Sequence, residues 1–190
     1  MSLIPNDYKD EMEVSEYFKL EPGENIVRIL DDEMQLGYEY WVDKDGNPVE
    51  RGNMAGEGSK PMRIKQGEKL SVELAECLKT IWACLVYNKS INKVQVWSIT
   101  QASIRKAINA LDRSKSWGDV KEYDISITKT GEKKETRYAT IPCPKEELGA
   151  NVWAEHLNMK ERFDWDKWWA SEDPFTKDEV DIDKVAKEIK

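Results

Sequence analysis

The sequence predicts a mainly β fold of the α+β class, and three observations lead to this prediction. Short runs rich in β-branched and aromatic residues recur through residues 25–141, with turn residues between them. One helical stripe stands among them, in residues 101–111. No apolar run approaches the roughly 18 residues that a membrane helix requires. We therefore expect a small sheet or barrel with one helix at its end.

The N-terminal half begins with two predicted strands. Residues 25–30 form a compact β-branched run after a Pro-Gly turn, and residues 37–42 form a second run that ends in the turn sequence of residues 43–48. Residues 49–69 contain four glycines and little periodicity, which predicts a loop. Leucines at 70, 74 and 78 then have helical spacing.

Two hairpins and a helix follow. Residues 80–87 and 94–100 are apolar runs joined by a polar turn, which predicts a hairpin. In residues 101–111 the apolar side chains have the spacing i, i+3, i+4 and i+7, and Thr100 is the expected N-cap. Residues 123–128 and 138–141 predict a second hairpin around a charged loop, residues 129–137.

The order strand, hairpin, helix, hairpin is that of an OB-fold, a five-stranded Greek-key barrel with one capping helix. Residues 31–79 are then a long insertion after the first strand. We divide the chain into an acidic N-terminal arm (1–23), the OB-fold domain (24–149) and a C-terminal extension (150–190) with an aromatic helical segment (153–169) and an acidic tail. In the arm, Tyr17, Phe18 and Leu20 are expected to dock on the domain.

Charge is distributed unevenly. Residues 60–149 carry 17 basic and 11 acidic side chains, whereas the flanking segments are acidic and the whole chain has a net charge of −8. A ligand responds to the potential within roughly 10 Å, so this distribution permits a polyanionic partner. Together with eight tryptophans, it favours binding of single-stranded nucleic acid.

Several sequence blocks resemble bacteriophage single-stranded DNA-binding proteins. The blocks are residues 82–88, 93–101 and 104–108, with further likeness in residues 37–41, 44–49, 117–119, 123–127, 130–131 and 142–145. The resemblance covers roughly residues 26–145. It implies an OB-fold that coats single-stranded DNA without strong sequence preference in phage DNA replication, recombination and repair, with no catalytic activity. The host would be an infected bacterium, and the N-terminus lacks signal-peptide features, so we expect a cytoplasmic location and reduced cysteines.

A site for any base sequence needs flat aromatic faces for stacking and cations for phosphates. The predicted nucleic-acid-binding residues are the aromatic Tyr38, Tyr40, Trp41, Trp82, Tyr87 and Trp97 and the basic Arg63, Lys65, Lys89, Lys93, Lys129, Lys133, Lys134 and Arg137. Core packing and base stacking remain equally open for Trp82 and Trp97. Each loop lysine taken singly is weak evidence, because a charged hairpin tip is usually just solvated, and the loop lysines count only as a cluster.

Other functions have weaker support in the sequence. Cys77, Cys84, Cys143 and His156 offer zinc-ligand types, but they lack the close Cys-x2-4-Cys pairs of structural zinc sites, so we expect neither metal nor cofactor. The acids of residues 31–33 suggest a nuclease, but a solvated turn explains them better. The remaining alternative is a protein-binding accessory factor of a phage replication or recombination complex. The acidic tail is a candidate segment for recruiting replication proteins.

Overall fold

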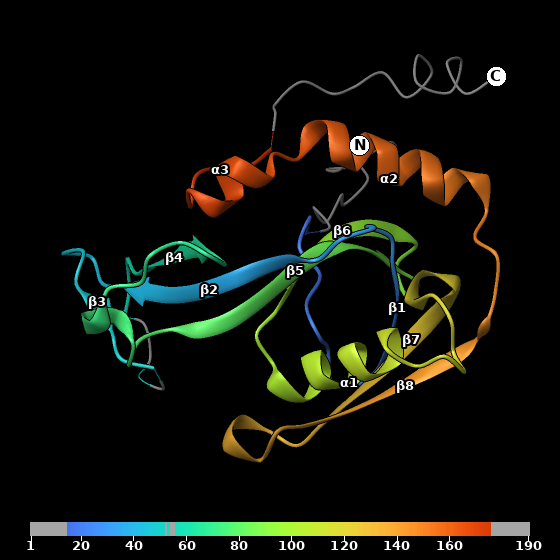
Figure 1. Ribbon diagram of the computed structural model, residues 1–190, viewed down its shortest axis with the longest axis horizontal. Helices are drawn as coiled ribbons and strands as arrows, with labels where there is room; N and C mark the ends of the chain where they lie inside the picture. The colour runs from blue at the N-terminus through green and yellow to red at the C-terminus, as the bar shows by residue number, and fades with distance from the viewer. Residues whose placement is uncertain (1–14, 52, 54–55, 176–190) are drawn as a thin grey trace, which may run out of the picture.

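The computed structural model describes residues 15–51, 53 and 56–175, and in this part of the chain eight strands form one antiparallel sheet (Figure 1). The strands are β1 (Gly23–Ile29), β2 (Gln35–Val42), β3 (Pro48–Val49), β4 (Lys60–Lys65), β5 (Lys79–Asn88), β6 (Lys93–Ile99), β7 (Tyr123–Thr130) and β8 (Arg137–Lys145). The helices are α1 (Ala102–Asp112), α2 (Ala150–Arg162) and α3 (Trp165–Trp169), with 3-10 turns at Val72–Leu74, Val120–Glu122 and Lys133–Glu135.

β5 is the centre of the sheet. One of its edges pairs with β6, and the other pairs with two strands in succession: β1 lies opposite residues 86–88 of β5, and β2 lies opposite residues 79–83. β1 and β2 therefore lie in tandem on one edge of β5, separated by the short segment 30–34. β2 also pairs with β4 and β3, and these three strands form an arm that projects from the sheet (Figure 1).

Both faces of β5 are buried, because the apolar run Ile81–Tyr87 points alternate side chains to opposite sides. Cys84 and Val86 join a first core with Trp97 and the α1 residues Ile104 and Ile108. Ile81, Ala83 and Leu85 join a second core beneath α2 and α3. The strand is thus the common wall of two hydrophobic layers.

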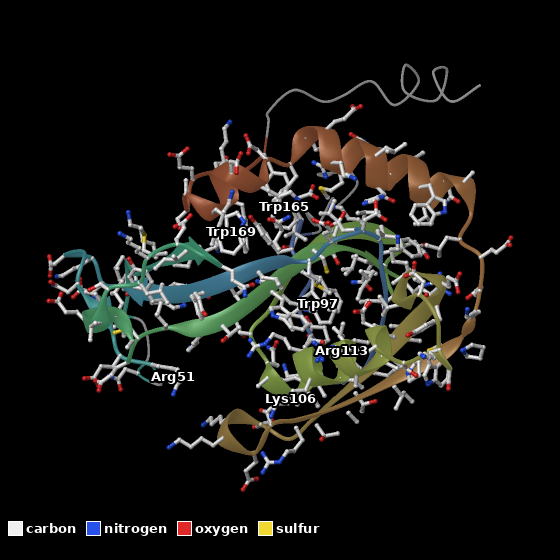
Figure 2. All side chains as sticks on the ribbon, viewed as in Figure 1. Arg51, Trp97, Lys106, Arg113, Trp165 and Trp169 are labelled. Atoms are coloured by element: carbon white, nitrogen blue, oxygen red, sulfur yellow. The ribbon has the colours of Figure 1, made fainter. Side chains whose placement is uncertain are left out.

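Two helical layers cover the sheet from opposite sides (Figure 1). α1 packs through Ile104, Ile108 and Leu111, which have the spacing of one helix face. α2 buries Val152, His156 and Met159 on the other side. Figure 2 shows Trp97 on the α1 side of the sheet and Trp169 between α3 and the sheet. None of the helices among the described residues is long and apolar enough to cross a membrane.

The predicted mainly β, α+β fold is confirmed, as are both hairpins, α1 and the helical segment after residue 150. The prediction of a loop throughout residues 49–69 is wrong, because Lys60–Lys65 forms β4 by pairing with β2. The predicted N-cap is also wrong: α1 begins after Gln101, which makes no side-chain cap hydrogen bond. The leucine spacing of residues 70–78 gives a single 3-10 turn.

The described part of the N-terminal arm docks as expected. Phe18 is buried, its amide donates to the Val96 carbonyl at 2.9 Å, and its ring lies 5.4 Å from the ring of Trp97 in an edge-on arrangement. Residues 1–14 and most of the predicted acidic tail, from residue 176 onward, lie outside the described residues.

Candidate functional site

The two faces of β2 differ in what covers them. Side chains alternate along the strand, so Leu36, Tyr38 and Tyr40 point to the side away from α3. The cross-strand neighbours on that side are Met62 and Ile64 of β4 and Trp82 of β5. All six side chains are partly exposed. We call this set, Leu36, Tyr38, Tyr40, Met62, Ile64 and Trp82, the open aromatic face.

The opposite face of β2 is closed by α3. A Cβ at Gly37 would lie 2.6 Å from Cη2 of Trp169, so glycine leaves the room that this indole fills. Trp169 donates its Nε1–H to Oε1 of Gln35 at 3.1 Å. The predicted binding residue Trp41 points to this same side and is half-buried, away from Tyr38 and Tyr40.

Arg63 is part of this closed face. Its guanidinium lies 4.1 Å above the Trp168 ring, donates to the Trp168 carbonyl at 3.0 Å, and forms an ion pair with Glu39 at 3.3 Å. Burial raises the pKa of Glu39, and the Arg63 charge opposes that rise. Burial lowers the pKa of Arg63, and the Glu39 charge opposes that change. Arg63, which was predicted to contact a phosphate, therefore packs α3 against β4.

A cationic group lies on the same side of the sheet as the open aromatic face. The 3-10 turn between β7 and β8 exposes Lys133 and Lys134, and Arg137 follows at the start of β8. Within residues 15–175, as far as they are described, these three side chains form no ion pair. Lys106 projects from α1 on the side opposite Trp97, toward this hairpin (Figure 2). We call Lys106, Lys133, Lys134 and Arg137 the cationic group.

Two predicted stacking residues are core residues. Trp97 is 1% exposed and packs in the first core, and Tyr87 is 8% exposed in the second core, with its hydroxyl donating to Oδ1 of Asn92 at 2.9 Å. Neither ring offers a free face to a base. Trp82 differs from both, because one side packs on the first core while the side chain remains partly exposed.

Several predicted phosphate contacts are ion-paired to distant acids. Lys65 pairs with Asp166 of α3 at 2.6 Å, and Lys93 pairs with Glu16 at 3.3 Å. Lys129 donates to the Leu20 carbonyl at 2.9 Å, which ties the N-terminal arm to β7. These lysines join segments of the chain and do not gather into one surface.

Lys89 has the most extensive of these networks. It contacts Asp124 at 2.6 Å and Glu146 at 2.5 Å, while Asp124 also pairs with the buried Arg28 at 2.7 Å. Partial burial lowers the pKa of Lys89, but the hydrogen bonds to Asp124 and Glu146 together outweigh that effect. The pKa of Lys89 is therefore raised. The same contact lowers the pKa of Glu146. Lys89 is a structural cation.

Other side chains of the site were not predicted from the sequence. Leu36, Met62 and Ile64 belong to the open aromatic face, and Lys106 belongs to the cationic group. The polar position of Lys106 on the amphipathic α1 was a usable signal, because it marks the exposed side of the helix. No such signal marked Met62 and Ile64, since their segment shows no clear alternation of apolar and polar side chains.

The residues considered for zinc binding and nuclease activity take structural positions. His156 contacts Asp31 at 2.9 Å, and the other oxygen of that carboxylate accepts the Leu85 amide at 2.7 Å. Asp32 pairs with Lys121. Burial raises the pKa of the Cys84 thiol well above its usual range. Among the residues that the structure describes, no three His, Cys, Asp or Glu side chains are placed to hold a metal ion.

Comparisons with protein-family models, with curated proteins and with solved structures found no match.

Proposed function

We propose that this protein binds single-stranded DNA without catalysis and largely without regard to base sequence, as its resemblance to bacteriophage single-stranded DNA-binding proteins implies. The observation that carries the proposal is the position of the open aromatic face and the cationic group on one side of the sheet, away from α3. Bases would stack on Tyr38, Tyr40 and Trp82, and phosphates would meet the cations.

The strand pairing supports an OB-fold as the finer description. β1, β5, β6, β7 and β8 follow one another as the five OB strands, with α1 between the third and the fourth. β1 pairs with both β5 and β7, β5 with β6, and β7 with β8. In this fold the segment between strands one and two and the hairpin between strands four and five bind oligonucleotides. Those segments are here the arm and the β7–β8 turn.

The chain departs from that pattern in two respects. Among the described residues β6 pairs only with β5 and not with β8, so the sheet is open. The second departure concerns the ligand-binding face. OB-folds also bind ligands on the outer face of strands two and three. Here that face is covered by α2 and α3, and Trp168 is 0% exposed beneath them. We therefore place the DNA on the arm and the β7–β8 hairpin, and not over the second core.

Stacking and phosphate contacts would both contribute to the affinity. Each base stacked on an aromatic ring contributes about 1–3 kcal/mol. Each phosphate contact on a single strand adds about 0.7 to the slope of log affinity against log salt concentration. With the four cations named above, the slope would be about 3 at most, so binding at low salt should weaken markedly as salt rises.

The test is a titration with oligo-dT, followed by fluorescence anisotropy of a label on the DNA. Tyr38→Ala and Tyr40→Ala should each weaken binding about tenfold, by the loss of one stack. Lys133→Ala with Lys134→Ala should reduce the salt slope by about 1.4. RNA and duplex titrations run in parallel measure the preference for single-stranded DNA.

Matched controls come from the other side of the sheet. Trp153 and Lys167 are exposed on α2 and α3, so Trp153→Ala and Lys167→Ala remove an aromatic ring and a cation without touching the proposed interface. Near-UV circular dichroism checks that each variant is folded. If the control variants weaken binding as much as the arm and hairpin variants, or if no oligonucleotide binds, the proposal is wrong.

A further inference from the structure

A second surface lies beside the open aromatic face. A cleft of about 990 Å³ opens between the β1–β2 segment and the C-terminal end of α1. Its apolar floor includes Met34, Leu36, Trp82 and Ile108, and Leu36 is 38% exposed. This volume is at the upper end of ligand-binding clefts in proteins, and an apolar floor of this kind suits an apolar side chain.

The lining of the cleft carries a net negative charge. The lining holds five acidic residues against three basic ones, and one of the five, Asp31, has its carboxylate bonded to His156 and to the Leu85 amide. Lys121 is engaged by Asp32 and by Asp119. Its hydrogen bond and charge lower the pKa of Asp32, which keeps that carboxylate ionised. Inside the cleft, a net negative lining favours a cationic group over an anionic one.

Two carboxylates at the cleft remain available to a ligand. Glu33 and Asp112 are exposed and form no ion pair with any residue in the described ranges, on opposite walls of the cleft. Arg113 and Lys115, at the end of α1, supply donors for backbone carbonyls of a bound chain.

We infer that this cleft is a docking site for a segment of a partner protein that carries lysine or arginine beside an apolar side chain. The apolar side chain lies on Leu36 and Trp82, and the cations meet Glu33 and Asp112. Charge complementarity selects this occupant over a nucleic acid strand. Because Leu36 and Trp82 also belong to the open aromatic face, an occupied cleft withdraws both from that face.

The probe is a short fluorescein-labelled peptide in which leucines are flanked by lysines. Fluorescence anisotropy measures its binding to the full chain at low salt, and two-dimensional amide NMR maps its position. Two control peptides carry glutamate in place of lysine, or serine in place of leucine. We expect the lysine–leucine peptide to bind best and to shift the signals of Met34, Leu36 and the Trp82 indole.

The double substitution Glu33→Lys with Asp112→Lys should weaken that binding about tenfold, which is about 0.7 kcal/mol for each reversed charge. Glu161→Lys is the matched control, because Glu161 is exposed on α2, on the other side of the sheet. Equal binding of the glutamate peptide, or shifts confined to other surfaces, would overturn the inference. So would sedimentation showing a dimer that Glu33→Lys dissociates, because the occupant would then be a second copy. None of these readouts requires DNA binding.

Discussion

The two faces of β2 differ in their surroundings: one packs against α3, and the other is partly exposed. On the closed face Gly37, Glu39 and Trp41 lie toward α3, where Trp169 fills the space above the glycine and Arg63 joins Glu39 to Trp168. On the open face Tyr38 and Tyr40 have β4 and β5 neighbours and remain partly exposed in the described part of the chain. Adjacent residues of one strand therefore have opposite roles, and residue type alone does not reveal them.

The largest expected difference between the faces concerns tryptophan. Trp168→Ala should destabilise the fold by about 3–5 kcal/mol, because a fully buried indole leaves a cavity and removes the ring beneath Arg63. Tyr38→Ala on the open face should cost about 1 kcal/mol. Urea unfolding followed by circular dichroism measures both free energies. Equal costs would show that the two faces are equally structural.

A smaller effect is expected at Gly37. Gly37→Ala should cost about 1–3 kcal/mol, since the new Cβ would lie 2.3 Å from the Ile64 carbonyl oxygen and 2.6 Å from Trp169, and one of them must move. Gly56→Ala is the control, because a Cβ there meets nothing within 4 Å. Its free energy of unfolding should change by about 0.5 kcal/mol or less. A tolerated Gly37→Ala would mean that α3 adjusts readily.

The smallest effect is a pH dependence at Glu39. Its pKa is raised in the folded protein, so folding disfavours the ionised form: the stabilising contribution is complete below the unfolded pKa and is lost as pH rises through the folded pKa. The free energy of unfolding of the native chain, minus that of Glu39→Gln, should therefore fall as pH rises above about 4.5. Urea titrations at several pH values measure this difference. A difference that rises with pH would mean that the Arg63 pair outweighs desolvation.

The sequence predicts those parts of the fold whose periodicity is local. The β5–β6 hairpin and α1 are visible because their apolar spacing is consistent over a whole element. β4 cannot be recognised from the sequence, because Lys60–Lys65 contains a proline and three cations. This segment becomes a strand only by pairing with β2. The tandem arrangement of β1 and β2 on β5 likewise depends on contacts between distant residues.

The candidate site is harder to predict than the fold, for two physical reasons. A continuous apolar run such as Ile81–Tyr87 is buried on both sides, so the alternation of side chains does not indicate which aromatic ring remains accessible. Trp97 is buried, whereas Trp82 stays partly exposed. The charge partners of Lys65, Lys89 and Lys93 lie far away in the sequence, so composition places them in a cationic segment although their charges are neutralised. Lys133 and Lys134 keep their charges because their turn is exposed.

The arm has no hinge where it meets the rest of the sheet. β2 extends the line of β1 and hydrogen-bonds to β5 through residues 35–39, so swinging the arm would break a continuous ladder at the centre of the molecule. The ladder consequently fixes the position of Tyr38 and Tyr40 relative to β5, whereas the β7–β8 turn lies beyond the paired residues of its hairpin. That turn, residues 131–136, extends past the last β7–β8 pair, Thr130 with Arg137.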